Sequence, residues 1–210
     1  MIDESSDARS PSPGADIWFV AVAASAGGLK ALTELLSALP SDFNAAVAIV
    51  QHRVPQKETH HQWLLSRHAT LPVMMASDGL AVQGGNVYLA SSESHLTVTA
   101  DGRFSHEDGL RVHGLRSAAN PLFASGAHVY KERMIAVVLT GSGSDGSEGV
   151  SEVSKEGGIV IAQDPATAEY TGMPDATIRT GLANHISPLS SIARILVAIV
   201  SGTSSSAEVA

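Results

Sequence analysis

The sequence predicts a three-layer α/β/α fold built on a doubly wound, mainly parallel β-sheet with one short antiparallel hairpin. Apolar runs alternate with segments of helical periodicity along the chain, the pattern of parallel strands joined by helices. The runs are apolar throughout, which is typical of strands that are covered on both faces. Glycine-rich turns follow two of them, and in such sheets the functional site lies at the carboxyl ends of the strands.

The first half of the chain supplies the strongest strand and helix signals. Ile17–Ala24 is a continuous apolar run, and the leucines between 29 and 39 then recur at helical spacing until Pro40 ends the helix. The next expected elements are a strand at Ala45–Val50, a helix at Lys57–His68 and a short strand at Val73–Ala76.

The middle of the chain predicts the hairpin and a helix. Short strand-like segments at Asn86–Ala90 and Leu96–Thr99 precede Asp101-Gly102, a typical two-residue hairpin turn. Asn120-Pro121 places a favoured N-cap residue before a proline at the first helical position, so we expect a helix to about Lys131.

The last third returns to alternation, within a single domain. The expected elements are a strand at Met134–Leu139, a helix to about Glu156 that Gly157-Gly158 ends, a strand at Ile159–Ala162 and a helix opened by Ser187-Pro188. We assign one domain to residues 16–200. Residues 1–15 are expected to be a disordered leader or linker remnant, and 201–210 a disordered tail.

Composition excludes several classes of protein. The formal charge of −8 argues against nucleic-acid binding, which needs Lys and Arg to neutralise phosphates. The absence of cysteine excludes disulfides, a cysteine nucleophile and thiolate metal sites, and is compatible with the cytoplasm. Ile17–Ala24 is too short to span a bilayer, and no basic region precedes it as in a signal peptide.

Ser25 lies in the turn between the first strand and the first helix, within Ala24-Ser25-Ala26-Gly27-Gly28. A serine there can present its hydroxyl at the sheet edge, and the free N–H groups of the helix start can stabilise an oxyanion. The turn resembles a nucleophile elbow in its mechanics, although G-x-S-x-G is absent. Two other interpretations stay open: Ser25 as a helix N-cap, and the turn as a phosphate-binding loop.

His52 and Asp145 follow two other predicted strands. His52, after the second strand, could take a proton from Ser25 and return it to the leaving group, or be an ordinary loop histidine. Asp145, in the glycine-rich turn after Met134–Leu139, could orient His52, or form a capping box with Glu148. Each signal is weak alone, but three strand ends carrying Ser, His and Asp together favour a catalytic triad.

These motifs resemble the catalytic domain of the chemotaxis protein-glutamate methylesterases, the CheB-type family. The resemblance covers about residues 16–200. Its matching pieces are Ala24-Ser25 with Gly27-Gly28, Gln51-His52 with Pro55, Asn86–Ala90 with His95, Leu139-Thr140-Gly141 with Gly143 and Asp145-Gly146, and Gly172-Met173-Pro174.

The resemblance implies a Ser/His/Asp hydrolase without metal or cofactor, with Ser25 as nucleophile, His52 as base and Asp145 as the orienting acid. It implies removal of methyl groups from glutamyl methyl esters on the cytoplasmic helices of chemoreceptors, with deamidation of receptor glutamines in some members. Ala26, Ser142 and Met173 are the expected oxyanion or substrate-pocket positions. A receiver domain or another signalling protein is a further expected partner, in the cytoplasm.

The chain departs from the family's pattern at several places. Ala26 stands where Thr is common, Ser142 where Met is common, and Leu115 replaces a usual His beside Arg116. The leader is too short for the family's receiver domain, so we expect either a catalytic fragment or a protein without that control. These departures favour, as an alternative, a weakly active or inactive partner-binding module of the same fold.

Other features of the sequence are weaker evidence for a function. A nucleotide-binding domain is a third hypothesis, but no lysine follows either glycine turn at P-loop spacing. His60-His61 lacks the further ligands that a metal site needs. Three arginines could attract an acidic receptor helix, or be ordinary surface residues: Arg53, Arg111 and Arg116.

Overall fold

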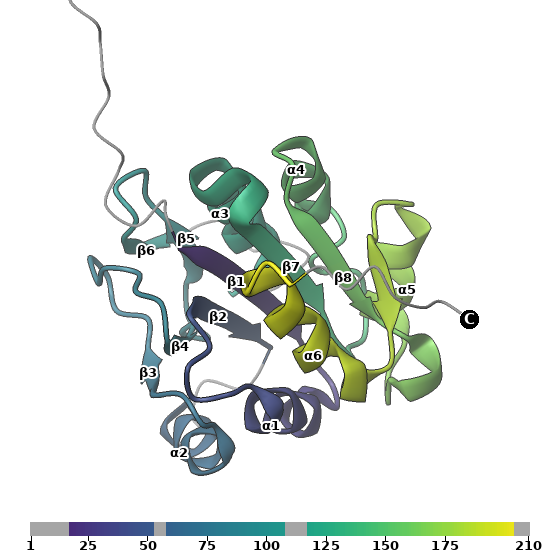
Figure 1. Ribbon diagram of the computed structural model, residues 1–210, viewed down its shortest axis with the longest axis horizontal. Helices are drawn as coiled ribbons and strands as arrows, with labels where there is room; N and C mark the ends of the chain where they lie inside the picture. The colour runs from purple at the N-terminus through teal and green to yellow at the C-terminus, as the bar shows by residue number, and fades with distance from the viewer. Residues whose placement is uncertain (1–16, 53–57, 108–116, 204–210) are drawn as a thin grey trace, which may run out of the picture.

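The computed structural model describes residues 17–52, 58–107 and 117–203, so the proposed leader and the tail beyond 203 lie outside it. Its centre is a seven-stranded sheet in which every neighbouring pair is parallel, in the order β3-β4-β2-β1-β7-β8-β9 (Figure 1). This confirms the predicted doubly wound parallel sheet. The strands are β1 (Trp18–Ala24), β2 (Ala45–Gln51), β3 (Val73–Met75), β4 (Asn86–Leu89), β7 (Met134–Val138), β8 (Ile159–Gln163) and β9 (His185–Ser187).

Helices cover both faces of the sheet and bury two separate apolar cores. One face packs against α1 (Gly28–Ala38), α2 (Glu58–His68) and α6 (Leu189–Val200). The other packs against α3 (Ala119–Tyr130), α4 (Gly149–Lys155) and the hairpin of β5 (His95–Val98) and β6 (Phe104–Glu107) (Figure 1). The remaining elements are α5 (Gly172–Arg179) and two 3₁₀ turns at Lys131–Arg133 and Pro165–Thr167.

The register of the central strands brings three turns to one edge. Ala24 at the end of β1 pairs with Gln51 at the end of β2, and Ala23 pairs with Val138 of β7. The residues after these strands therefore emerge side by side, and β1 is the point from which the chain winds in opposite directions.

The structure confirms the short antiparallel hairpin, formed by β5 and β6, and corrects two details of the region around it. Asn86–Leu89 is not part of the hairpin but a parallel strand between β2 and β3. The turn between β5 and β6 is longer than two residues, because Thr99 and Arg103 still pair and Gly102 takes the left-handed conformation (φ 72°). Helix α5 and strand β9 were not predicted.

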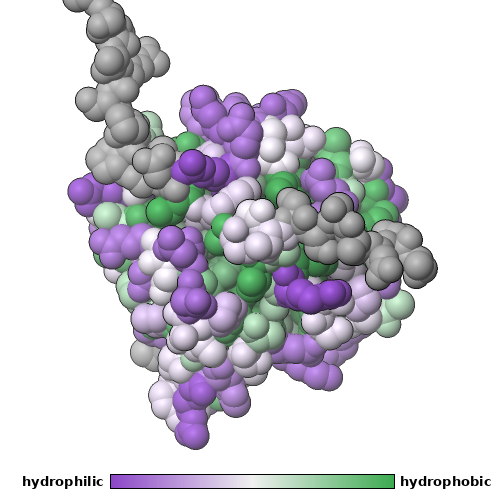
Figure 2. All heavy atoms as spheres, in the orientation of Figure 1, coloured by the Kyte–Doolittle hydropathy of each residue, from purple (hydrophilic) through white to green (hydrophobic). Residues whose placement is uncertain are grey.

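Surface and core are divided as in a water-exposed globular domain. Figure 2 shows hydrophilic and hydrophobic residues interspersed over the face that carries α1 and α6. The leucines of α1 that predicted its helix include Leu32, Leu35 and Leu36, which are buried against the sheet. None of the helices in the described ranges has both the length and the apolar character needed to cross a bilayer.

Candidate active site

Ser25 does not cap helix α1. The N-cap position is Gly27, which is left-handed (φ 74°) and offers no side-chain cap. A side chain at Gly27 would also meet Glu169 and Thr140, with Cβ about 3.0 Å from Glu169, so the tight turn requires glycine. Among the described residues the half-buried Ser25 hydroxyl has no hydrogen-bond partner, so the N-cap interpretation is wrong.

Thr140, the second residue after β7, fastens the Ser25 turn to the sheet. Its carbonyl accepts a hydrogen bond from the Ser25 N–H (3.0 Å), and its hydroxyl donates to the Ala26 carbonyl (3.0 Å). The same hydroxyl accepts from the Tyr170 N–H (2.9 Å), and the Thr140 N–H donates to the buried Gln163 side chain (2.8 Å). The turn is therefore held by fixed hydrogen bonds on a rigid strand end.

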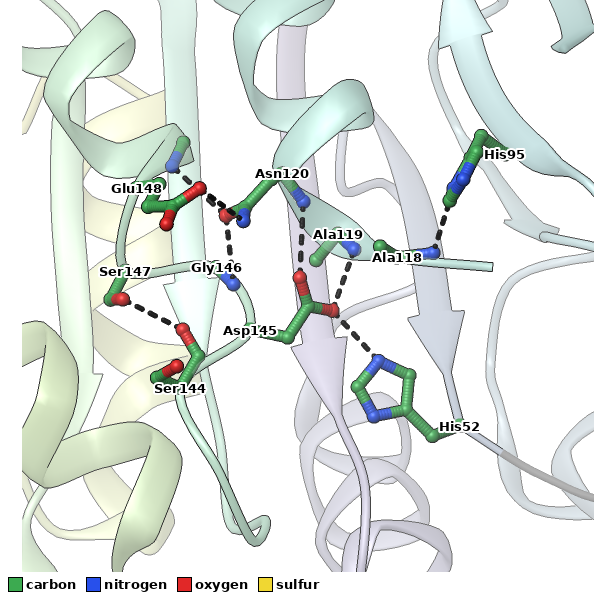
Figure 3. A network of polar contacts seen from close by, with 11 residues as sticks. His52, His95, Ala118, Ala119, Asn120, Ser144, Asp145, Gly146, Ser147 and Glu148 are labelled. Carbon is green, nitrogen blue, oxygen red and sulfur yellow. Dashed lines mark hydrogen bonds and ion pairs between the residues drawn. The ribbon is translucent and has the colours of Figure 1, made fainter. Parts of the chain in front are cut away.

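His52 and Asp145 form the central pair of the site. The His52 Nε2 atom lies 2.7 Å from Asp145 Oδ2, with side chains 12% and 2% exposed (Figure 3). An ionised carboxylate only accepts hydrogen bonds, so Nε2 carries the proton in the neutral ring and Nδ1 is left with its lone pair. Among the described residues, Nδ1 has no hydrogen-bond partner. The pair is thus arranged as in a triad, but the carboxylate holds the Nε2 edge of the ring.

The first turn of α3 cradles the Asp145 carboxylate. Ala119 N–H donates to Oδ2 (2.7 Å) and Asn120 N–H donates to Oδ1 (3.4 Å) (Figure 3). A helix N-terminus favours a negative charge, so α3 stabilises the ionised form. The capping box of Asp145 with Glu148 is therefore wrong, and α4 has no side-chain cap.

Asn120 is not the N-cap of α3, because the helix begins at Ala119 with Ala118 as its N-cap. Its side chain is buried and instead binds the turn that carries Asp145. Asn120 Oδ1 accepts from the N–H groups of Gly146 (2.9 Å) and Gly149 (3.0 Å). The helix start and the Asp145 turn are thereby locked together (Figure 3).

His95 supports the same helix start from the hairpin. It is 3% exposed, and its Nδ1 atom accepts a hydrogen bond from the Ala118 N–H (3.1 Å). Ala118 directly precedes the Ala119 N–H that holds Asp145. The structure therefore gives His95 a supporting place behind the site, which pattern reasoning from the sequence did not resolve.

The electrostatics of Asp145 favour a permanent negative charge. Burial alone would raise the pKa of this carboxyl, but hydrogen bonds from His52 and Ala119, the charge of a protonated His52 and the Asn120 N–H together hold the pKa below its ordinary value. An ionised, buried carboxylate at this position accepts a hydrogen bond from the Nε2 edge of the His52 ring and so fixes the orientation of the imidazole.

Two pockets flank the Ser25 turn. One, of about 410 Å³, is lined by Ser25, Gly27, Gly28, Leu29, Lys30 and Gln51. The other, of about 170 Å³, lies on the Thr140 side and is lined by residues that include Glu34, Gln163 and Glu169. A substrate can therefore approach Ser25 at the open edge of the sheet.

The three expected pocket positions differ in surroundings. Ala26 follows Ser25 and, within the described residues, its N–H is free of backbone partners. Ser142 is exposed in the glycine-rich turn. Met173 is fully buried and packs over Gly141, where a Cβ atom would lie 2.2 Å from Met173 Sδ and 2.8 Å from Ser25 Cβ. Met173 thus supports the Ser25 site from the core.

Comparison with known proteins places this arrangement in a family. The protein-family model described as CheB methylesterase matches residues 20–196 of this chain. The chain belongs to the CheB methylesterase family. Its fold matches the crystal structure of the Thermotoga maritima CheB methylesterase catalytic domain with a TM-score of 0.85 and 32% identity, over 88% of this chain and 100% of that one. This confirms the resemblance that the motifs predicted.

Curated members of the CheB methylesterase family are similar over most of this chain. A protein-glutamate methylesterase/protein-glutamine glutaminase of Pyrococcus horikoshii is 35% identical over 86% of the chain, and one of Myxococcus xanthus 39% identical over 88%. The chain spans about half the length of these two relatives (50% and 52%). It spans 92% of a putative protein-glutamate methylesterase/protein-glutamine glutaminase of Leptospira interrogans, at 31% identity.

Several residues considered from the sequence do not join the CheB-type site in the described structure. His60 stacks on the exposed Trp63 of α2, with ring centroids 6.0 Å apart. Across the described ranges, no group of three or more His, Cys, Asp or Glu residues could hold a metal ion. Six residues named in the sequence analysis lie outside the described residues: Arg53, Pro55, Lys57, Arg111, Leu115 and Arg116.

Proposed function

We propose that this chain is a protein-glutamate methylesterase that hydrolyses glutamyl methyl esters on the cytoplasmic helices of chemoreceptors, with Ser25 as nucleophile, His52 as base and Asp145 as the orienting acid. The observation that carries the proposal is the 2.7 Å contact of His52 with Asp145 at the same sheet edge as Ser25, in a chain of the CheB methylesterase family. We place the protein in the cytoplasm, where these receptor helices lie.

In the first half of the reaction, Ser25 Oγ attacks the ester carbonyl carbon while His52 Nδ1 takes the hydroxyl proton. The carbonyl electron pair moves to oxygen, giving a tetrahedral oxyanion. When this pair returns, the bond to the methoxy group breaks, and His52 gives its proton to the leaving oxygen. Methanol departs and the glutamyl group remains esterified to Ser25.

In the second half, water takes the place of methanol. His52 removes a proton from the water, whose oxygen attacks the acyl carbon, and collapse of the second oxyanion breaks the bond to Ser25 Oγ. The proton returns from His52 to Ser25, leaving a glutamate carboxyl group. A glutamine side chain reacts by the same steps with ammonia as the leaving group, which supports deamidation as a second activity.

The substrate is tested with receptor membranes whose glutamyl esters carry a labelled methyl group. We expect the wild-type protein to release labelled methanol, and receptors that carry glutamine at the same positions to release ammonia. Label that stays on the receptors would contradict the proposed esterase activity. Release of methanol without ammonia would support the esterase activity and contradict the deamidase activity.

A further inference from the structure

The amide side chain of Gln51 has no assigned role and lies beside Ser25. Gln51 is the last residue of β2, opposite Ala24, and precedes His52. It is only 6% exposed, yet it lines the 410 Å³ pocket together with Ser25 and Gly28. Its Nε2 atom faces the start of α1, 3.6 Å from where a Cβ atom of Gly28 would lie.

Neither end of the Gln51 amide is used within the described structure. Oε1 is buried without a hydrogen-bond partner, and Nε2 donates to none of the described residues. Burying an unpaired amide lowers stability, so such a group calls for an explanation beyond packing. The buried unpaired atom is the acceptor Oε1, whereas Nε2 keeps some contact with solvent, so its N–H groups are the part of the amide that is available to a substrate oxygen in the pocket.

A second strand-end glutamine shows what a structural role looks like in this fold. Gln163 is the last residue of β8 and is 1% exposed. Its Oε1 accepts from the Thr140 N–H (2.8 Å), and its Nε2 donates to the Thr167 carbonyl (3.0 Å). Gln163 is thus fully bonded within the protein, whereas Gln51 keeps its donors free beside Ser25.

The backbone around Ser25 offers few free N–H groups to an oxyanion, so a side-chain donor could add to them. The Ser25 N–H is occupied by the Thr140 carbonyl, so it is not available to an oxyanion. Among the described residues the N–H groups of Ala26 and Gly27 have no backbone partner. Two backbone donors and one side-chain amide would complete a set such as serine hydrolases use to bind the oxyanion.

We propose that Gln51 is a catalytic residue whose Nε2–H donates a hydrogen bond to the oxyanion formed when Ser25 attacks the carbonyl carbon. The inference rests on the proposed esterase function and adds one residue to its mechanism. The bond to Gln51 strengthens as the carbonyl π pair moves onto oxygen, and weakens again when the methoxy group leaves. Its contribution therefore falls on kcat rather than on substrate binding.

The test is methanol release by Gln51→Met, with Gln163→Met as the matched control. Met has a similar volume and no donor, so kcat should fall about 10²- to 10³-fold with little change in KM. The melting temperature should stay the same or rise, because an unpaired buried amide is removed. Gln163→Met should instead lower the melting temperature, because it leaves the buried Thr140 N–H without a hydrogen-bond acceptor.

The outcomes separate this proposal from the function on which it rests. A Gln51→Met protein whose kcat stays within about twofold of a methanol-releasing wild type overturns the role of Gln51 alone. A Gln51→Met protein that loses melting temperature together with kcat also overturns it, because a lower melting temperature, as expected for Gln163→Met, marks a structural glutamine. If the wild-type protein releases no methanol, the esterase function and the Gln51 role both fall.

Discussion

Replacing Ser25 by alanine is expected to lower kcat for methanol release by about 10⁶-fold, the scale of losing a serine nucleophile. The hydroxyl has no hydrogen-bond partner among the described residues, so its removal leaves none of their donors or acceptors unpaired. The melting temperature should therefore stay close to that of the wild type. The measurement is methanol release from labelled receptor membranes, beside a thermal unfolding curve of each protein.

Ser144→Ala is the matched control for Ser25→Ala. Ser144 is an exposed serine in the turn that leads to Asp145, and its removal deletes the same hydroxyl group from the same edge of the molecule. We expect this variant to keep wild-type kcat. Equal methanol release by the wild type and Ser25→Ala would show that Ser25 is not the nucleophile.

Replacing Asp145 by asparagine is expected to lower kcat by about 10⁴-fold, the loss that the same exchange causes in the serine-protease triad. The neutral amide no longer stabilises an imidazolium at His52. It also cannot accept from every donor that now surrounds the carboxylate, because its NH₂ group must face a backbone N–H of Ala119 or Asn120. The measurement is kcat from methanol release at saturating receptor.

Glu148→Gln is the control for Asp145→Asn, since it removes a carboxylate from the same turn without touching His52. We expect its kcat to lie within about twofold of the wild type, because the charge of the exposed Glu148 is screened by solvent. A kcat for Asp145→Asn within tenfold of the wild type would remove Asp145 from the mechanism.

The pH dependence of unfolding gives a second readout of Asp145. Its pKa is lowered in the folded protein, so the unfolded chain takes up this proton first as the pH falls. The contribution of Asp145 to the free energy of unfolding is therefore complete above about pH 5 and is lost as the pH falls through the lowered pKa. The difference in stability between the wild type and Asp145→Asn should shrink below about pH 4.

The strand ends were predictable because they depend on local patterns. Continuous apolar runs identified β1, β2 and β7, and parallel pairing then places the residues after them at one edge. That reasoning was enough to predict that His52 and Asp145 would lie together, as they do.

The environment of Asp145 was not predictable in the same way. Asn120-Pro121 carries the local signature of a helix start, but the helix begins two residues earlier, at Ala119, and a carboxylate from another loop binds its first turn. Which donors meet which acceptors across such a distance in sequence depends on tertiary packing, which overrides a local capping preference.

The role proposed for Gln51 depends on absence of bonding, which no sequence pattern encodes. Gln51 and Gln163 both end apolar strands, and the structure alone distinguishes the free amide from the bonded one. Helix α5 was missed for a different reason, since Gly172–Arg179 is short and opens with Gly172 and Pro174, two residue types that disfavour a helix interior.

The central claim is that His52 activates Ser25 as a nucleophile. The most direct measurement is reaction with a fluorophosphonate, followed by peptide mass spectrometry to locate the adduct. We expect a single adduct on Ser25 in the wild-type protein, and loss of that adduct in folded His52→Ala. An adduct on another residue, or labelling of Ser25 at an equal rate in His52→Ala, would contradict the account.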